Sequence, residues 1–290
     1  MNPLSKISEL FSYHFMVNAY AAGTIVAVCA GAIGWFMVLR RQTFAGHTLA
    51  VIGFPGASAA VFLGLSVSTG YFVSCIGGAV IIGLLPRGTT GETRVAESAV
   101  IGTIQAFALA AGVLFVNLYQ GFLNGVTSLL FGSFLGITNT QVVVLGAVCG
   151  LATVALAAIA RPLLFASVDA DVASARGVPV QSLSVAFLVL LGAAVAAASQ
   201  ITGSLLVFAV LVMPAAAAQR LTNNPRRSLV ISIAIAVVIT WLGLYAAYVS
   251  SYPVGFYLTS IGFVIYLLAI GSEYLRSHRP LRTSSIRAHR

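Results

Sequence analysis

Charged residues are scarce in this chain. Among its 290 residues, Asp, Glu, Lys and Arg together make up only 7%, whereas a soluble domain carries about a quarter. Hydrophobic residues make up 59%, and the mean hydropathy is +1.02. This composition excludes a soluble globular protein and predicts an all-α polytopic membrane protein, whose solvent is largely a lipid bilayer.

Motifs for catalysis and nucleotide binding are also missing. No GxxxxGK[ST] loop occurs, so the chain is not expected to bind ATP in that manner. There is no HExxH motif, the four His are scattered, and no nucleophile stands beside a base. The three Cys have no CxxC spacing and are interpreted as small packing residues. We therefore expect no catalytic activity, no bound cofactor and, despite a net charge of +9, no nucleic-acid partner.

Long apolar runs fill most of the chain. A spanning helix needs about 20 mainly apolar residues, and roughly nine stretches meet that criterion. A Gly-broken stretch at 122–136 is interpreted as dipping into the membrane without crossing it. A polar Ser199-Gln200 turn is predicted to separate the sixth span from the seventh. The nine predicted spans are 17–39, 46–65, 71–85, 97–119, 141–160, 183–198, 201–217, 228–250 and 254–271.

The basic residues alternate with these spans. Of the 15 Lys and Arg, 14 follow the odd-numbered spans, and only Lys6 falls on the other side. The positive-inside rule then predicts an outer N-terminus and a cytoplasmic C-terminus in the inner (plasma) membrane. Residues 1–272 are predicted to form the transmembrane domain, and 273–290 a basic cytoplasmic tail attracted to anionic headgroups.

The loop between the fifth and sixth spans carries helix signals of its own. Ser167 or Asp169 can cap a short helix that runs through Asp171. Gly177 can end that helix in a left-handed conformation, and Pro179 blocks its continuation. Such a helix on the cytoplasmic face is either a simple connector or a coupling helix that seats in a groove of a cytoplasmic ATPase.

This loop, VDADVASARGVP, resembles the cytoplasmic loop of permeases of ABC-type divalent-metal importers, those for zinc, manganese and iron. The segments VLRRQTFAGHTLAVIGFPGASAA, RVAESAVIGTIQAFALAAGVLF, SLLFGSFLGIT and ITGSLLVFAVLVMPAAAAQRLT are similar to further blocks of that family, in the same order. The resemblance implies a homodimer, a separate cytoplasmic ATP-binding subunit, an extracytoplasmic metal-binding protein and a divalent metal ion as transported substrate. It implies an ATPase-coupling loop made of Asp169, Asp171, Arg176, Gly177 and Pro179.

The second predicted span departs from that family. Typical members carry an acidic residue and a His one turn apart, where this chain has His47 and Val51. Imidazole is a good ligand for zinc, manganese or iron, so His47 is the candidate metal ligand on the pathway. It falls about 9 Å along the helix from Arg41, which predicts a place near the cytoplasmic end instead of the midplane. A structural His, hydrogen-bonded to nearby backbone, is the alternative.

Other residues are weaker candidates for the pathway or its gates. Glu97 opens the fourth predicted span, where a carboxylate favours a helix N-terminus. Gln105, Asn124 and Gln200 could line a cavity or hydrogen-bond across helices. Pro55-Gly56 and Pro214 interrupt two spans, which either exposes backbone carbonyls to a pathway or simply reflects how common both residues are in membrane helices.

Two other kinds of transporter remain as alternatives. A secondary transporter would need several buried carboxylates near the midplane, and none of the six acidic residues is clearly central. A permease for a vitamin or an iron siderophore would share the coupling loop, but such chains usually have about ten spans, whereas the charge alternation supports nine.

Overall fold

The computed structural model describes residues 13–85, 91–118, 129–132, 136–250 and 252–277, without the side chains of 91–98. Within these ranges the chain forms ten helices and no β-strand, which confirms the predicted all-α class. The helices are α2 (His14–Leu39), α3 (Thr43–Phe62), α4 (Val67–Leu84), α5 (Gly91–Leu118), α7 (Asn139–Val168), α8 (Ala170–Ala175), α9 (Val180–Thr202), α10 (Val207–Leu221), α11 (Pro225–Val249) and α12 (Val254–Ser277).

The count of membrane spans agrees with the prediction of about nine. Eight of the described helices are long and apolar enough to cross a membrane, and α10 is a shorter apolar helix of 15 residues. At 1.5 Å per residue α10 is about 22 Å long, less than the roughly 30 Å of a hydrocarbon core. It therefore covers only part of the depth that its neighbours cross.

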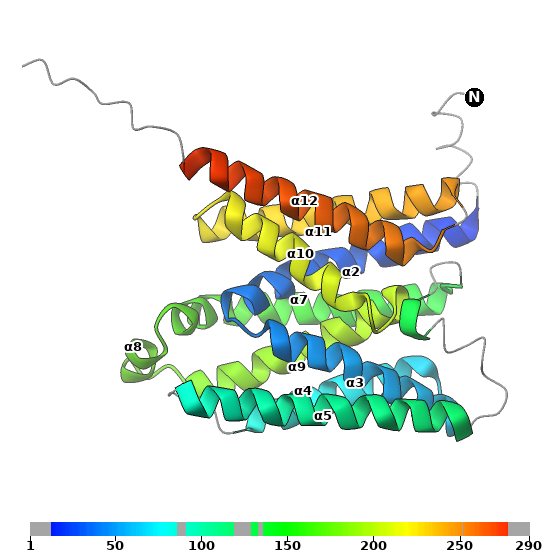
Figure 1. Cartoon of the computed structure of the whole chain (residues 1–290), viewed down its shortest axis with the longest axis horizontal. Helices are drawn as coiled ribbons and strands as arrows, with labels where there is room; N and C mark the ends of the chain where they lie inside the picture. Colours follow the sequence, from blue (N-terminus) through cyan, green and yellow to red (C-terminus); the bar gives the residue numbers. More distant parts are fainter. Residues whose placement is uncertain (1–12, 86–90, 119–128, 133–135, 251, 278–290) are drawn as a thin grey trace, which may run out of the picture.

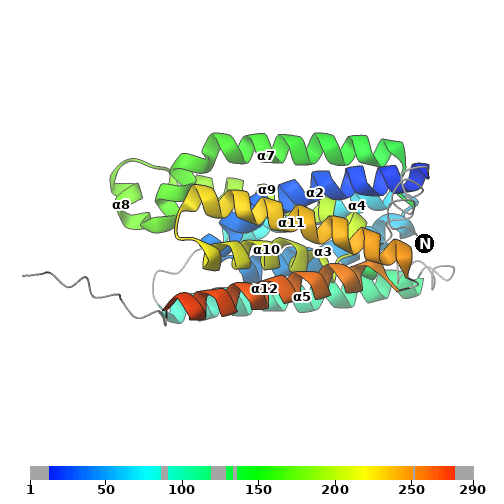
Figure 2. The same ribbon diagram turned by 90° about the horizontal axis from the view of Figure 1, so that it is seen from above.

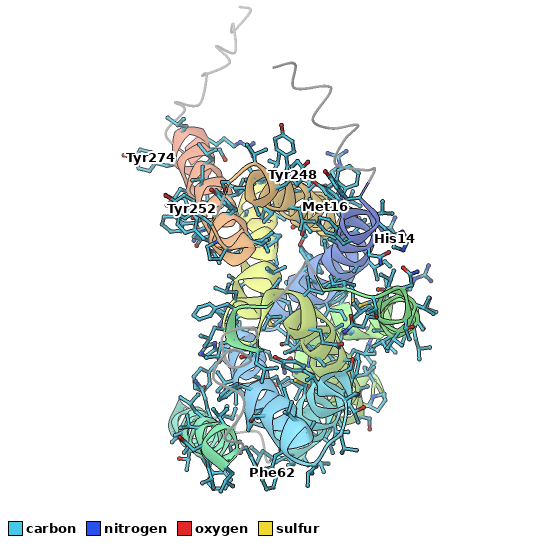
Figure 3. The ribbon with its side chains drawn as sticks, turned by 90° about the vertical axis from the view of Figure 1, so that its right-hand side faces the viewer. His14, Met16, Phe62, Tyr248, Tyr252 and Tyr274 are labelled. Atoms are coloured by element: carbon cyan, nitrogen blue, oxygen red, sulfur yellow. The ribbon has the colours of Figure 1, made fainter. Side chains whose placement is uncertain are left out.

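The long helices lie side by side with nearly parallel axes, and the short α8 projects beyond one end of them (Figures 1 and 2). Across the bundle, α11 and α12 lie at one extremity and α5 at the other (Figures 1 and 3). The end opposite α8 carries His14, Phe62, Tyr248 and Tyr252, which face the viewer in Figure 3. This is the end that the charge pattern predicts to be outside.

Burial separates central helices from peripheral ones. In the most apolar 18-residue stretch of α2, 72% of the residues are buried, whereas in that of α5 only 17% are buried. α2 packs on α7, α10 and α11, while α5 packs mainly on α3. The outward side chains of α5 include Phe107 and Leu114, both exposed. An exposed apolar face is what lipid or a second membrane-embedded chain would cover.

The boundary between the sixth and seventh spans differs from the prediction. Ser199 and Gln200 are helical, and α9 continues to Thr202. The chain turns at Gly203, which has a φ of +78°. The amide N–H groups of Ser204 and Leu205 donate to the carbonyls of Leu129 and Leu130, at 3.1 and 3.2 Å. The turn is therefore fixed by close backbone pairing with residues 129–132, not by the polar pair.

The predicted tail also begins later than expected. α12 continues to Ser277, so the first five residues assigned to the tail are helical. Among them, Glu273 pairs with Arg220 at 2.7 Å, and Arg276 donates to the Leu221 carbonyl at 2.7 Å. These contacts tie the end of α12 to the end of α10. The remainder of the tail, and most of the predicted dipping stretch at 122–136, lie outside the described residues.

Replacing Gly203 by Val is expected to destabilise the protein. A Cβ atom there would collide with the backbone of Leu130 and Gly132, and the positive φ would add strain. We expect the thermal midpoint of the detergent-solubilised protein to fall by about 5 °C or more. Gly150→Val is the matched control, because nothing lies within 4 Å of a Cβ at Gly150. Equal midpoints for the two variants would contradict the described turn.

Candidate metal pathway and coupling loop

The predicted short helix in the loop after the fifth span is present as α8, Ala170–Ala175. α7 ends at Val168, eight residues beyond the predicted end of that span. Asp169 is extended, and its Oδ1 accepts a hydrogen bond from the Val172 amide at 2.9 Å. Asp171 lies in the first turn, where its negative charge is favoured by the helix dipole. Of the two predicted caps, Asp169 is therefore the one used, and Ser167 lies inside α7.

The other end of α8 is closed as the sequence predicts. Gly177 has a φ of +80°, and the amide of Val178 donates to the carbonyl of Ala173 at 3.0 Å. Pro179 then caps the start of α9. Ala173 is fully buried against the flanking helices, whereas Arg176 is exposed, as are Asp169, Asp171 and Val172. The result is a short helix, fixed at both ends, that presents charged and apolar side chains beyond the end of the bundle (Figure 2).

His47 lies in the second turn of α3 against α10. Its ring contacts the ring of Phe208 edge-on, with centroids 5.0 Å apart. The Nδ1 atom is buried and has no hydrogen-bond partner among the described residues. The structural alternative required a hydrogen bond from this ring to nearby backbone, and the described contacts include none. A buried imidazole nitrogen without a protein partner can instead be paired by a water molecule or an ion.

The neighbours of His47 come from α5 and α10. Thr48, the next residue, donates a hydrogen bond to Gln105 at 3.1 Å, and Gln105 is at the middle of α5. Phe208 lies at the start of α10, about 20 Å along the helix from its end at Leu221. Within α5, Gln105 is the seventh residue of the apolar segment Ala99–Leu118, so the predicted place of His47 toward the cytoplasmic end stays a prediction.

Gln105 has a partner in the structure. Its Oε1 accepts the bond from Thr48 Oγ1, and Thr48 is fully buried. This contact joins α5 to α3 next to His47, so Gln105 lies beside the candidate ligand while serving as a bridge between helices.

Glu97 does not lie at the start of its helix. α5 begins at Gly91, so Glu97 is in its second turn, and its side chain lies outside the described residues. The expected role at the helix N-terminus therefore does not apply.

Neither proline breaks its helix. α3 runs through Pro55 to Phe62, and α10 runs through Pro214, which is buried. A Cβ at Gly56 would collide with Ser74 and with the Gly70 carbonyl of α4. Gly56 thus allows close packing of α3 on α4, and the break that was predicted at Pro55-Gly56 is absent from this continuous helix.

A polar pocket lies near the predicted outer end of the bundle. It has a volume of about 340 Å³, and Gln200 lines it as expected for a cavity residue. Its other polar side chains are Ser68, Tyr71, Gln141 and Ser199, and none of the described residues that line it is charged. His47 is not among its residues, so this pocket is separate from the candidate ligand. Asn124 lies outside the described residues.

The sequence interpretation missed two residues that the structure brings to these sites. Phe208 covers the His47 ring, and nothing in its local sequence indicates that contact. Arg40 hydrogen-bonds to Ser167 and to Ser184, one on each side of α8 along the chain. Its place after the first span indicated only a charge on the predicted cytoplasmic side. No group of three or more His, Cys, Asp or Glu in the described part of the chain could hold a metal ion.

The sequence model of the ABC 3 transport family matches residues 12–272. The chain belongs to this family. Among similar proteins, this ABC 3 family member is 27% identical over 261 residues to the manganese transport system membrane protein MntC of Halalkalibacterium halodurans, covering 90% of this chain and 88% of MntC. It is 29% identical over 266 residues to the chelated iron transport system membrane protein YfeC of Yersinia pestis, covering 92% and 89%.

A solved structure has the same fold. PsaBC from Streptococcus pneumoniae, determined in complex with Fab, superimposes with a TM-score of 0.82 at 25% identity. The match covers 94% of the ABC 3 chain and 98% of the PsaBC chain. Together with the eight spanning helices, the family match identifies a multi-pass permease of the inner membrane.

The left-handed residue after α8 supplies a test of that loop. Gly177→Val is expected to abolish transport while the protein still inserts, because a β-branched residue is strained at a φ of +80° and displaces the end of α8. Gly177→Asn is the matched control, since Asn tolerates this conformation. Substrate uptake is measured at equal amounts of membrane-inserted protein. Normal uptake by the Val variant would count against a role for α8 in transport.

Proposed function

We propose that this chain is the membrane-spanning subunit of an ATP-driven importer for a divalent metal ion, with zinc, manganese and iron as the candidate cargoes. The observation that carries the proposal is the family match over residues 12–272. Relatives that are similar along about nine tenths of the chain are named for manganese or chelated iron transport.

In this proposal α8 is the contact with a separate cytoplasmic ATP-binding subunit. The sequence has no P-loop motif, so ATP would be bound and hydrolysed on that partner. α8 suits such a contact because both its ends are fixed and its exposed side chains include Val172 and Asp171. Val168, at the end of α7, is 78% exposed and adds an apolar anchor beside them.

The metal would pass His47. A chain with one available imidazole supplies two in a homodimer, which is the assembly expected for this class of permease. Two imidazoles are fewer than the four ligands of a closed zinc site, so binding would be weak enough for release. An extracytoplasmic metal-binding protein would then supply the affinity that the membrane subunit lacks. Phe208 contacts the ring edge-on and would keep its orientation fixed as the ion arrives.

The proposal is tested by the metal content and growth of a deletion strain under zinc, manganese and iron limitation. The strain must lack other importers for these metals. We expect the wild-type chain to restore one metal selectively. We expect His47→Ala to lower initial uptake roughly tenfold, which corresponds to about 1.4 kcal/mol of lost interaction.

His14→Ala is the control for loss of an imidazole. His14 lies at the opposite end of the bundle, where it hydrogen-bonds to Asn139 at 3.1 Å, and its removal should leave uptake unchanged. Equal restoration by wild type and His47→Ala would leave the importer but make His47 structural. A deletion without any metal phenotype would contradict the proposal and favour a vitamin or siderophore cargo.

A further inference from the structure

The connector between α2 and α3 is short and well bonded. It consists of Arg40, Arg41 and Gln42, whose amides donate to carbonyls in the last turn of α2 at 2.9 to 3.0 Å. The Gln42 carbonyl accepts from the Gly46 amide at 3.0 Å, within the first turn of α3. There is no slack between the two helices, so a displacement of the connector is passed to the start of α3 and to His47, one residue further on.

The Arg40 side chain joins this connector to both helices that flank α8. Its Nη1 donates to Ser167 Oγ at 3.1 Å, and its Nη2 donates to Ser184 Oγ at 2.6 Å. Ser167 is two residues before the Asp169 cap of α8, and Ser184 lies in the second turn of α9. Arg40 Cζ also lies 5.5 Å from the centre of the Phe187 ring of α9.

The chemistry of the guanidinium suits this place. Its donors are held in a rigid plane, so one side chain can serve two acceptors and stack on a ring at the same time. Ser184 and Phe187 are fully buried, so their side of the contact is fixed. Ser167 is at the end of α7, next to the segment that projects from the bundle. A displacement of α8 would therefore move Ser167 and, through its hydrogen bond, Arg40. The contacts of Arg40 with Ser184 and Phe187 would stay in place.

We infer that Arg40 is the positioning residue that transmits displacement of α8 to α3 and so couples ATP hydrolysis by the partner subunit to the state of the pathway at His47. The inference rests on the proposed function, because it requires α8 to be the ATPase contact. It assigns the coupling to one side chain, whereas the proposed function assigns only the docking loop.

The test uses the permease reconstituted in proteoliposomes with its ATP-binding subunit and the metal-loaded binding protein. Metal uptake and ATP hydrolysis are measured in the same preparation. For Arg40→Ala we expect basal hydrolysis to be retained, stimulation by the loaded binding protein to be lost, and metal carried per ATP to fall roughly tenfold. Arg40→Lys, which cannot reach two acceptors and stack, is expected to rescue only part of the coupling.

Arg41→Ala is the matched control. Arg41 is the adjacent arginine, and its exposed side chain has no hydrogen bond or ion pair with the described residues. Loss of this charge should leave metal carried per ATP at the wild-type value. Ser167→Ala and Ser184→Ala are expected to lower the ratio less than Arg40→Ala does, and each should have little further effect in an Arg40→Ala background, because the contacts form one unit.

A wild-type ratio of metal to ATP in Arg40→Ala would overturn the inference. If Arg40→Ala does not fold, the Ser167→Ala/Ser184→Ala double variant replaces it, and a wild-type ratio there has the same meaning. Failure of the proposed function is distinguishable, because the wild-type complex would then carry none of the three metals. If Gly177→Val loses coupling while Arg40→Ala keeps it, α8 remains the proposed ATPase contact. Arg40 would then have no role in transmitting its displacement.

Discussion

Lipid hydrocarbon offers no hydrogen bonds, so each polar side chain inside this bundle must find its partner within the protein. Most do so locally or across one helix contact. Thr240 donates to the Ala236 carbonyl of its own helix at 2.8 Å, and Ser232 donates to the Gly31 carbonyl of α2 at 2.8 Å. Against this background the unpartnered Nδ1 of His47 is an exception among the described residues. A buried polar group without a partner costs free energy, and a transported ion would supply the missing interaction.

The same constraint explains the form of the end that carries α8. At that end Asp169 accepts a hydrogen bond from the first turn of α8, and the left-handed Gly177 ends the helix. Arg40 donates a hydrogen bond to Ser184 of α9. The segment between α7 and α9 is therefore a shaped projection and not a loose loop. Hydrogen bonds of Arg40 join this segment to the connector before α3. The projecting helix and the candidate ligand are therefore linked by a continuous series of contacts.

Local signals made much of this predictable from the sequence. Runs of apolar residues marked the spanning helices, and Asp169, Gly177 and Pro179 marked both ends of α8, because capping and left-handed turns depend on residues close in sequence. The contacts of Arg40 with Ser184 and of His47 with Phe208 join residues more than a hundred positions apart, and no local pattern indicates them. The predicted end of α9 was wrong because a turn was expected at the polar pair Ser199-Gln200. The chain turns instead at Gly203, which has a positive φ and lies against residues 129–132.

Transport of a divalent metal ion by this permease would draw its energy from ATP. The most direct measurement is accumulation of zinc, manganese or iron by proteoliposomes that contain the wild-type chain, its ATP-binding subunit and the external binding protein. We expect saturable accumulation of at least one of these metals that requires ATP and stops when it is withheld. ATP-dependent accumulation of a vitamin or a siderophore, with none of the three free metals carried, would contradict it.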